Sequence, residues 1–487
     1  MSATSVFSSQ KMVNIRKRRM FKDAAAKWLV TIGGSLVIVS LLLIFIYLFS
    51  VVMPMFEGAS VEEKQSVTLS VNKHATRVIV AEEQNEIALS VAEDGSYEFF
   101  SLLDGTSIEK AILAPAAAIY AQPSVTRDIF LTTLDNRVVA VRPVFDVTYP
   151  DNMRLITPSL EFPLGEEGIA LRDGISKVNR LAGFIGEEQG LVVLKSAEAL
   201  HFLELLKEES LFADEASWEY ESSQLAFPEP LQNILMTSDM KAAFAVTGSG
   251  EIVYIDLRDK SSPTVIDRIR IDAGVVKATM LAGGVSLLVA NGDGLLQQMF
   301  LVKNEAGQPH LEVIRTFETD VGYIQDVVPE SARRGFWVLG KSGKAELRHA
   351  TSGSSLFEQD FGEGVVALSI PPRANGVITH YADGKTTFWH VENEHPEISW
   401  NSLWGKVWYE GYEQPEYIWQ SSAANNDFEP KFSLVPISFG TIKAAFYAML
   451  VATPLAVLGA IYAAYFMSPG MRKIVKPTVE IMEALPT

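Results

Sequence analysis

The sequence contains no cysteine and only seven histidines, which follow no spacing typical of a metal site. The missing cysteines exclude disulfide bonds, zinc–thiolate centres and cysteine nucleophiles. No His-Glu-x-x-His motif is present, and Gly248-Ser249-Gly250 lacks the third glycine and the following helix of a dinucleotide-binding loop. Because no motif for catalysis, a metal or a cofactor is found, we expect that the chain is not an enzyme and needs no cofactor.

Charge of either sign is absent from two long apolar runs, Trp28–Met53 and Ala444–Met467. As helices rising about 1.5 Å per residue, these runs would measure roughly 39 and 36 Å, more than a hydrocarbon core of about 30 Å. A cleaved signal peptide would have a shorter apolar region followed by small residues. We therefore predict two transmembrane helices, over residues 28–54 and 436–467, of which the first is an uncleaved anchor.

Basic residues cluster beside both runs, on the side away from the intervening chain. Residues 1–27 carry seven lysines and arginines against one aspartate. The positive-inside rule predicts that both chain ends are cytoplasmic and that the intervening segment lies in the periplasm of a bacterial inner membrane. Next to such runs, an orientation signal explains the clusters better than a nucleic-acid site. The residues assigned to orientation or to contact with a cytoplasmic partner are Arg16, Lys17, Arg18, Arg19, Arg472, Lys473 and Lys476.

The segment between the runs is strongly acidic. The whole chain has a net charge of −18, while residues 1–56 carry +6 and residues 431–487 carry +3, which leaves −27 for residues 57–430. A domain with this charge repels anionic polymers and anionic lipid headgroups. We therefore expect no nucleic-acid partner, and we expect a binding or docking module.

A repeat of turn residues followed by alternating apolar residues runs through residues 57–396. Its anchors are 41, 61, 53, 44, 49 and 41 residues apart, close to the period of about 40–50 residues in propeller blades. We predict a mainly β fold, a seven-bladed WD-type β-propeller flanked by two transmembrane helices, with Val67–Val71 closing the ring. A pair of β-sandwiches is the alternative. The anchors are Gly95, Asn136, Ala197, Gly250, Gly294, Gly343 and Gly384.

Aromatic residues crowd the segment 397–435, which we call the elbow. Four of the eight tryptophans of the chain fall within twenty residues there. On a helix, the spacing of four between Trp400, Trp404 and Trp408 would place them in one stripe, and such rings favour the headgroup level of a bilayer. We predict that the elbow lies in the outer membrane interface. Core packing against the last blade is the alternative.

Two residues of the second run and the segment after it carry further expectations. Pro454 removes a backbone donor and should kink the helix. Lys443, near the outer end, should extend its charge to the interface, although attraction of an anion toward a pore is an alternative. Residues 468–487 should form a cytoplasmic loop and the start of a third helix.

Residues 400–487 also contain an ordered set of four motifs, namely Ser402–Trp408, Phe432–Ile442, Thr453–Val457 and Lys476–Thr487. This set resembles the permease subunits of phosphate-type ABC importers, above all the C-type phosphate permease. The resemblance implies a second permease subunit, cytoplasmic ATPase subunits that hydrolyse ATP, and a soluble periplasmic phosphate-binding protein, with the lipid bilayer as the surrounding medium.

The chain departs from that family in two respects. Short members have a brief loop where this chain has the acidic domain, and this sequence stops before the loop that presses against the ATPase. We therefore expect that the chain is truncated at its C-terminal end. The alternative function is a two-pass scaffold or sensor that presents its propeller to envelope proteins, and the sequence beyond Thr487 would discriminate between the two.

Overall fold

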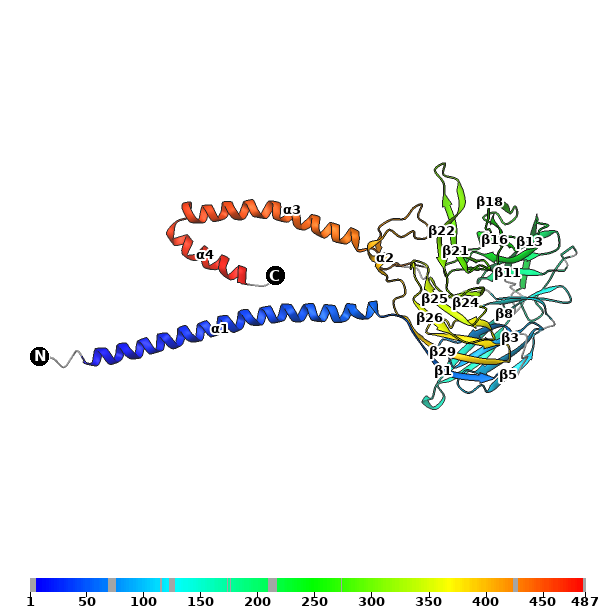
Figure 1. Ribbon diagram of the computed structural model, residues 1–487, viewed down its shortest axis with the longest axis horizontal. Coiled ribbons are helices and arrows are strands. Elements are labelled where there is room, and N and C mark those ends of the chain that lie inside the picture. The colour runs from blue at the N-terminus through cyan, green and yellow to red at the C-terminus, as the bar shows by residue number, and fades with distance from the viewer. Residues whose placement is uncertain are drawn as a thin grey trace. The chain divides into compact units, whose positions relative to one another are not determined.

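The computed structural model describes most of the chain. It consists of two compact units, a helical unit of residues 1–57 and 438–487 and a β unit of residues 58–437 (Figure 1). The residues described are 6–68, 76–113, 116–121, 128–172, 174–175, 177–208, 217–272, 274–423 and 428–484.

The helical unit contains two helices long and apolar enough to cross a membrane, over Asn14–Phe56 and Leu434–Phe466. The first comprises α1 (Val6–Val52) and the short η1 (Met53–Phe56), so the helix begins well before the apolar run. Residues 16–27 continue it because lysine, arginine and alanine are good helix formers and no glycine or proline interrupts them. Its basic cluster is therefore a helical extension of the apolar run.

The second long helix changes geometry near its C-terminal end. Pro454 lies inside α3 (Leu434–Ile461), which continues through it, and the last turn widens into the π-helical η3 (Tyr462–Phe466). Helix α4 (Pro469–Ala484) follows at once, where we expected a loop. The Ser-Pro pair at its start is a typical helix beginning, because proline suits the first helical position.

The β unit is built from seven antiparallel sheets that follow one another along the chain. The first sheet contains β2 (Thr76–Ala81), β3 (Ile87–Ala92), β4 (Ser96–Ser101) and β5 (Ser107–Ile112). The second contains β6 (Ala116–Ala121), β7 (Ile129–Thr133), β8 (Arg137–Thr148), β9 (Leu155–Glu161) and β10 (Ile169–Ala170), and η2 (Pro150–Asn152) joins β8 to β9. The third contains β11 (Arg180–Ile185), β12 (Gln189–Lys195), β13 (Ala199–Glu208) and β14 (Ser217–Ala226).

The fourth sheet contains β15 (Leu231–Met236), β16 (Ala242–Thr247), β17 (Glu251–Asp256) and β18 (Thr264–Arg270). The fifth contains β19 (Lys277–Met280), β20 (Leu287–Ala290), β21 (Leu295–Lys303) and β22 (Pro309–Glu318). The sixth is β23 (Ile324–Pro329), β24 (Gly335–Gly340), β25 (Lys344–His349) and β26 (Phe357–Asp360). The seventh combines β27 (Val365–Ser369), β28 (Gly376–Tyr381) and β29 (Lys385–Glu392) with the N-terminal strand β1 (Ser60–Thr68).

The sheets are blades of a ring. The first strands of neighbouring blades contact each other from β6 through β11, β15, β19, β23 and β27 to β2. Strand β1 pairs with β29 from Ser60 opposite Glu392 to Thr68 opposite Lys385, and so completes the seventh blade. The unit is a seven-bladed β-propeller, and the alternative of two β-sandwiches is wrong. Of the predicted closing segment, residues 69–71 lie outside the described residues.

All seven predicted anchors lie in the turn between the second and third strands of a blade. Six of the seven anchors adopt a positive φ, for example 64° at Asn136 and 91° at Gly343, and Ala197 is the exception. A Cβ at Gly343 would also overlap the carbonyl oxygen of Gly362. The Asp-Gly and Ser-Gly signals in the sequence therefore mark the repeat unit correctly.

Apolar side chains fill the spaces between neighbouring blades. The second strands β3, β16, β20 and β24 are buried along their whole length. Phe317 of blade five meets Phe336 of blade six edge to face at 5.5 Å, and Phe361, after blade six, meets Trp389 of blade seven at 5.1 Å. Burial of such faces against each other is the main favourable term in folding a ring of blades.

Candidate coupling site between elbow and propeller

The directions of the strands define two sides of the propeller. In every blade the third strand begins at one of the seven anchor turns, which we call the turn side, and ends on the opposite side, which we call the exit side. Glu392 ends β29 on the exit side, and Ser60 begins β1 directly opposite it. The chain therefore enters and leaves the propeller on the exit side, and the loops between first and second strands lie there too.

The elbow contains a short helix near its start, α2 (Trp400–Trp404). Ser399 caps the N-terminus of this helix, and Gly405 caps its C-terminus. The side chains of Trp400 and Trp404 are 73% and 48% exposed. Trp408 lies beyond the helix, so the predicted stripe of three tryptophans is wrong. Glycine terminates the helix before the next turn can form.

Trp408 packs on the propeller instead. Its ring meets Phe300 of β21 edge to face at 6.4 Å, and its Nε1 donates to the carbonyl oxygen of Tyr412 at 2.8 Å. This contact matches the alternative of core packing, but on blade five and not on the last blade. A location of Trp400 and Trp404 in a membrane interface stays a prediction.

Two adjacent arginines in the loop between β23 and β24 hold the chain that follows the last blade. Arg333 pairs with the buried Glu330 at 2.7 Å and donates to the carbonyl oxygen of Asn393 at 2.5 Å. Arg334 donates from Nη2 to Oε2 of Glu410 at 2.9 Å, and both of these side chains are buried. One loop of blade six thus binds both the start of the segment after β29 and the middle of the elbow.

A second acid lies beside this ion pair. Oε2 of Glu429 accepts a hydrogen bond from the backbone N–H of Glu410 at 3.3 Å. Burial raises the pKa of Glu429 to about 7, and the neighbouring Glu410 carboxylate adds to the rise. Among the described residues, Oε1 of Glu410 has no hydrogen-bond partner. The site therefore holds a paired carboxylate next to one that titrates near neutral pH.

Lys431 is a second buried cation of the site, beside Arg334. Its Nζ donates to the carbonyl oxygen of Glu429 at 3.0 Å and to Gln420 at 3.2 Å. It also lies 4.9 Å from the ring centre of Phe428 and 5.6 Å from that of Tyr409, which partly replaces its lost hydration. Burial lowers the pKa of Lys431. Strand β31 (Lys431–Phe432) pairs here with β30 (Trp419–Gln420).

Residues of blades five and six complete the site. Arg315 of β22 donates to Gln298 at 2.8 Å and to the carbonyl oxygen of Ala350, and burial lowers its pKa. His349, which ends β25, contacts the hydroxyl of Thr351 at 2.9 Å. Burial lowers the pKa of His349 to about 3, and Arg333, Arg315 and Arg334 add to the effect. Burial, reinforced by the three arginines, therefore keeps this histidine neutral.

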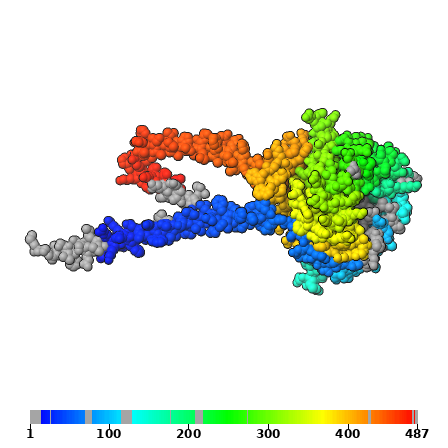
Figure 2. All heavy atoms as spheres, in the orientation of Figure 1, coloured from blue at the N-terminus to red at the C-terminus, as the bar shows by residue number. Residues whose placement is uncertain are grey.

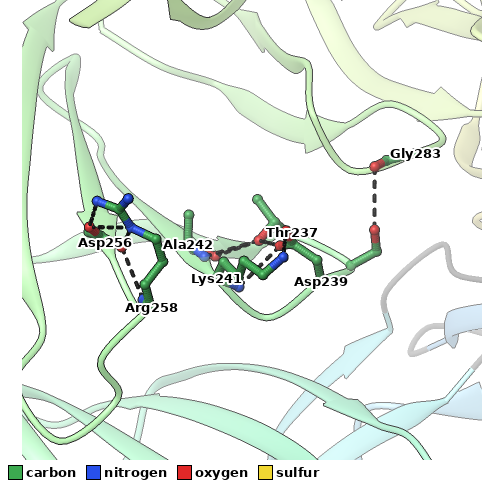
Figure 3. A network of polar contacts seen from close by, with 8 residues as sticks. Thr237, Asp239, Lys241, Ala242, Asp256, Arg258 and Gly283 are labelled. Carbon is green, nitrogen blue, oxygen red and sulfur yellow. Dashed lines mark hydrogen bonds and ion pairs between the residues drawn. The ribbon is translucent and has the colours of Figure 1, made fainter. Parts of the chain in front are cut away.

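Other polar contacts on the exit side have simpler roles. In the loop between β15 and β16, Asp239 accepts hydrogen bonds from the hydroxyl of Thr237 at 2.7 Å and the backbone N–H of Lys241 at 3.1 Å (Figure 3). Ser238 donates to the carbonyl oxygen of Gly283 in blade five at 3.3 Å. These bonds close a turn and join two blades, which explains the presence of Asp239 without a functional role.

The cations predicted from the sequence all belong to the helical unit, and none of them takes part in the site. Arg472 donates to the carbonyl oxygens of Ala464 at 2.8 Å and Met467 at 3.2 Å, which places a positive charge at a helix C-terminus. Lys443 is exposed and lies 5.9 Å from the ring centre of Tyr447. The other predicted cations are exposed, and they are Arg16, Lys17, Arg18, Arg19, Lys473 and Lys476.

No pattern in the sequence identifies the charged residues of the coupling site. Among the described residues, no group of three or more histidine, aspartate or glutamate side chains could hold a metal ion. The site combines alternating charges with aromatic faces in a buried setting, which suits mechanical attachment of the elbow. Its residues are Arg315, Arg334, Glu410, Glu429 and Lys431.

Comparison with known proteins finds similarity to solved structures alone. No protein-family model and no curated protein matches the sequence. Among solved structures, the crystal structure of the β-propeller domain of Cps50 (Swd1) from Myceliophteria thermophila is similar, with 12% identity and a TM-score of 0.46 over 68% of this chain and 100% of that one. The strand pairing described above defines the class, a seven-bladed β-propeller protein with two membrane-length helices.

Proposed function

We propose that the chain is the permease subunit of an ABC importer in a bacterial inner membrane and that its substrate is inorganic phosphate. The observation that carries the proposal is the position of the propeller between two membrane-length helices. The basic clusters lie at the ends of those helices remote from the propeller in the chain, which supports a periplasmic propeller. The phosphate assignment is supported by the motifs of residues 400–487 described above.

In this proposal the propeller is a docking or regulatory module, and the elbow transmits conformational changes of the propeller to α3. The buried Glu429 and Lys431 precede the first residue of α3, Leu434, by only a few residues. The backbone N–H of Ser433 donates to the carbonyl oxygen of Ile418 at 2.9 Å, so the start of α3 is fixed to the elbow. A change in how the elbow packs on blade six would therefore act directly on α3.

The proposed partners follow from the same reading. A periplasmic phosphate-binding protein would dock on the propeller side of the membrane, while a second permease subunit would pack against the apolar helices. Cytoplasmic ATPase subunits would supply the energy, since no catalytic group is assigned to this chain. The small residues Gly33 and Gly34 give a close approach surface on α1 for a neighbouring helix.

Uptake measurements test the proposal. Deletion of the gene should abolish high-affinity uptake of labelled phosphate and leave uptake of sulfate and molybdate unchanged, and reintroduction of the gene should restore phosphate uptake. Loss of sulfate or molybdate uptake would change the substrate. Normal uptake of all three would favour the alternative of a membrane scaffold that presents its propeller to envelope proteins.

A fusion experiment tests the orientation separately. A reporter that is active only outside the cytoplasm should work when inserted near residue 300 and fail when fused near residue 10. The reverse pattern would contradict a periplasmic propeller, whatever the uptake result.

A further inference from the structure

One hairpin of blade two extends beyond its blade. Strand β8 leaves its blade partner β7 at Val141, the last residue of their register, and pairs only with β9 from Arg142 opposite Glu161 to Thr148 opposite Leu155. Figures 1 and 2 show the hairpin as a turquoise projection from the propeller. Because β8 is a third strand, the hairpin projects on the exit side.

The base of this hairpin is fixed. Phe145 meets Phe99 of blade one edge to face at 6.0 Å, and Ile156 is buried in the same apolar cluster. Arg142 pairs with the buried Asp128 at 2.6 Å, and Arg154, beside the tip, pairs with Glu86 of blade one. The hairpin therefore holds its tip in a defined position and is not a loose loop.

The tip is apolar on both faces. Four large apolar side chains around η2 are between 46% and 69% exposed, and they are Val147, Tyr149, Met153 and Leu155. Exposed apolar groups gathered at one point of a soluble domain indicate a contact surface. The hairpin β21–β22, which also extends on the exit side, has a polar tip instead, closed by the Asn304 side chain, which accepts hydrogen bonds from the backbone of Ala306 and Gln308. A long hairpin does not by itself require an apolar tip.

The tip lies on the same side as the point where the chain enters the propeller. Ser60 lies opposite Glu392, the eighth residue after the anchor Gly384, and Val144 is the corresponding residue of β8. The tip at η2 begins six residues later in the chain, and the ion pair of Arg154 with Glu86 holds it beside the exit-side loop of blade one. The tip and the chain entry therefore share the exit side.

We propose that the tip of the β8–β9 hairpin inserts into the outer headgroup layer of the bilayer as a third membrane contact, which sets the tilt of the propeller. The proposal rests on the membrane topology of the proposed function. Three features share the exit side, namely the tip, the point where the chain enters the propeller, and the elbow with its exposed tryptophans. Tyrosine among aliphatic side chains is the composition that favours this layer.

The negative charge of the domain disfavours anionic lipid headgroups, so charge does not drive this contact. The tip carries Asp146 and Asp151, while Arg154 pairs with Glu86, so attraction to anionic lipid is not the driving force. Burial of the four apolar side chains drives the contact instead. A free domain with so small an apolar surface would bind a bilayer weakly, but anchoring helices keep the tip near the membrane at a high effective concentration.

The absence of cysteine from the chain makes a direct test possible. Thr148→Cys places a unique thiol in the tip and retains all four apolar side chains. The full chain is labelled there with an environment-sensitive fluorophore and reconstituted in phosphatidylcholine nanodiscs. We expect quenching by headgroup-proximal doxyl lipid to be several-fold stronger than for two controls, Ala306→Cys in the polar hairpin tip and Leu134→Cys on the turn side, while iodide quenching is weaker.

A second variant tests the cause. Tyr149→Ser combined with Met153→Ser should move the label at residue 148 into water, so that its iodide quenching equals that at residue 134. Equal iodide quenching without these substitutions overturns the proposal. Protection from both quenchers also overturns it, because a protein then covers the tip. Lipid quenching without phosphate transport retains the third contact and removes only the transport function, whereas transport without lipid quenching does the reverse.

Discussion

The two attachments of the propeller to the rest of the chain are built differently. The N-terminal attachment, β1, is a mostly exposed strand that buries Val67 and whose backbone pairs with β29 along almost its whole length. The C-terminal attachment, the elbow, has little regular structure and depends on buried ions and aromatic rings. Backbone pairing tolerates most side chains, whereas a buried ionic site responds to pH and to single substitutions. Of the two attachments, the elbow is therefore the one suited to regulation.

The largest effect is expected from breaking the N-terminal attachment. Gln65→Pro combined with Ser66→Pro places proline at two successive positions of β1, so at least one removes a hydrogen bond to β29. Opening of the ring should cost at least about 4 kcal/mol of unfolding free energy, measured by urea unfolding of the chain in detergent. Threonine at both positions is the control. A proline variant as stable as this control would mean that β1 is dispensable.

The next largest effect is expected at the ion pair of the elbow. Arg334→Met leaves Glu410 buried without its partner and should reduce the unfolding free energy by about 3–5 kcal/mol. Adding Glu410→Leu should restore most of the loss. The exposed pair of Arg373 and Glu83 is the matched control, since Arg373→Met should cost less than about 1 kcal/mol. Equal losses at the two arginines would refute the difference between buried and surface pairs.

The stability of the elbow should also depend on pH. The pKa of Glu429 is raised to about 7 in the folded protein, so between about pH 4.5 and 7 the folded state binds more protons than the unfolded state. Stability of the elbow should therefore be highest at low pH, fall by roughly 1–3 kcal/mol as pH rises from about 4.5 to 7, and level off above 7. Glu429→Gln should remove this fall, as measured by proteolysis of the elbow at several pH values. An unchanged pH profile in this variant would assign the titration to another group.

The smallest effect is expected at the exposed end of the elbow. Trp400→Ser should change the unfolding free energy by less than about 0.5 kcal/mol, because the ring is largely exposed. Trp408→Ser should cost about 3 kcal/mol or more, because it removes the contact with Phe300. Urea unfolding compares the two. Similar costs would show that Trp400 also packs on the propeller.

The fold was largely predictable because its signals are local. An Asp-Gly or Ser-Gly pair between two alternating apolar strands specifies a hairpin within a few residues, and five of the seven turns contain such a pair, while the other two contain Asp-Asn and Ser-Ala. The membrane-length helices were predictable for the same reason, since length and absence of charge are read directly from the run.

The coupling site was not predictable because its parts are distant in sequence. Arg334 and Glu410 are separated by 76 residues, and nothing near either of them indicates burial. The stripe of tryptophans failed at one residue, Gly405, which ends α2 before Trp408. A glycine after a single turn was a helix-terminating signal that the spacing of four obscured.

Closure of the ring by β1 has a consequence for biosynthesis. The strand made first must wait for its partner, which is more than 300 residues further along the chain. At 5–20 residues per second, that interval is roughly 16–65 s. During it, β1 has no partner strand, and the nascent seventh blade later displays an open edge until the two meet. Assembly of the ring is therefore limited by ribosomal timing, and a chaperone that shields unpaired strands would act on this edge first.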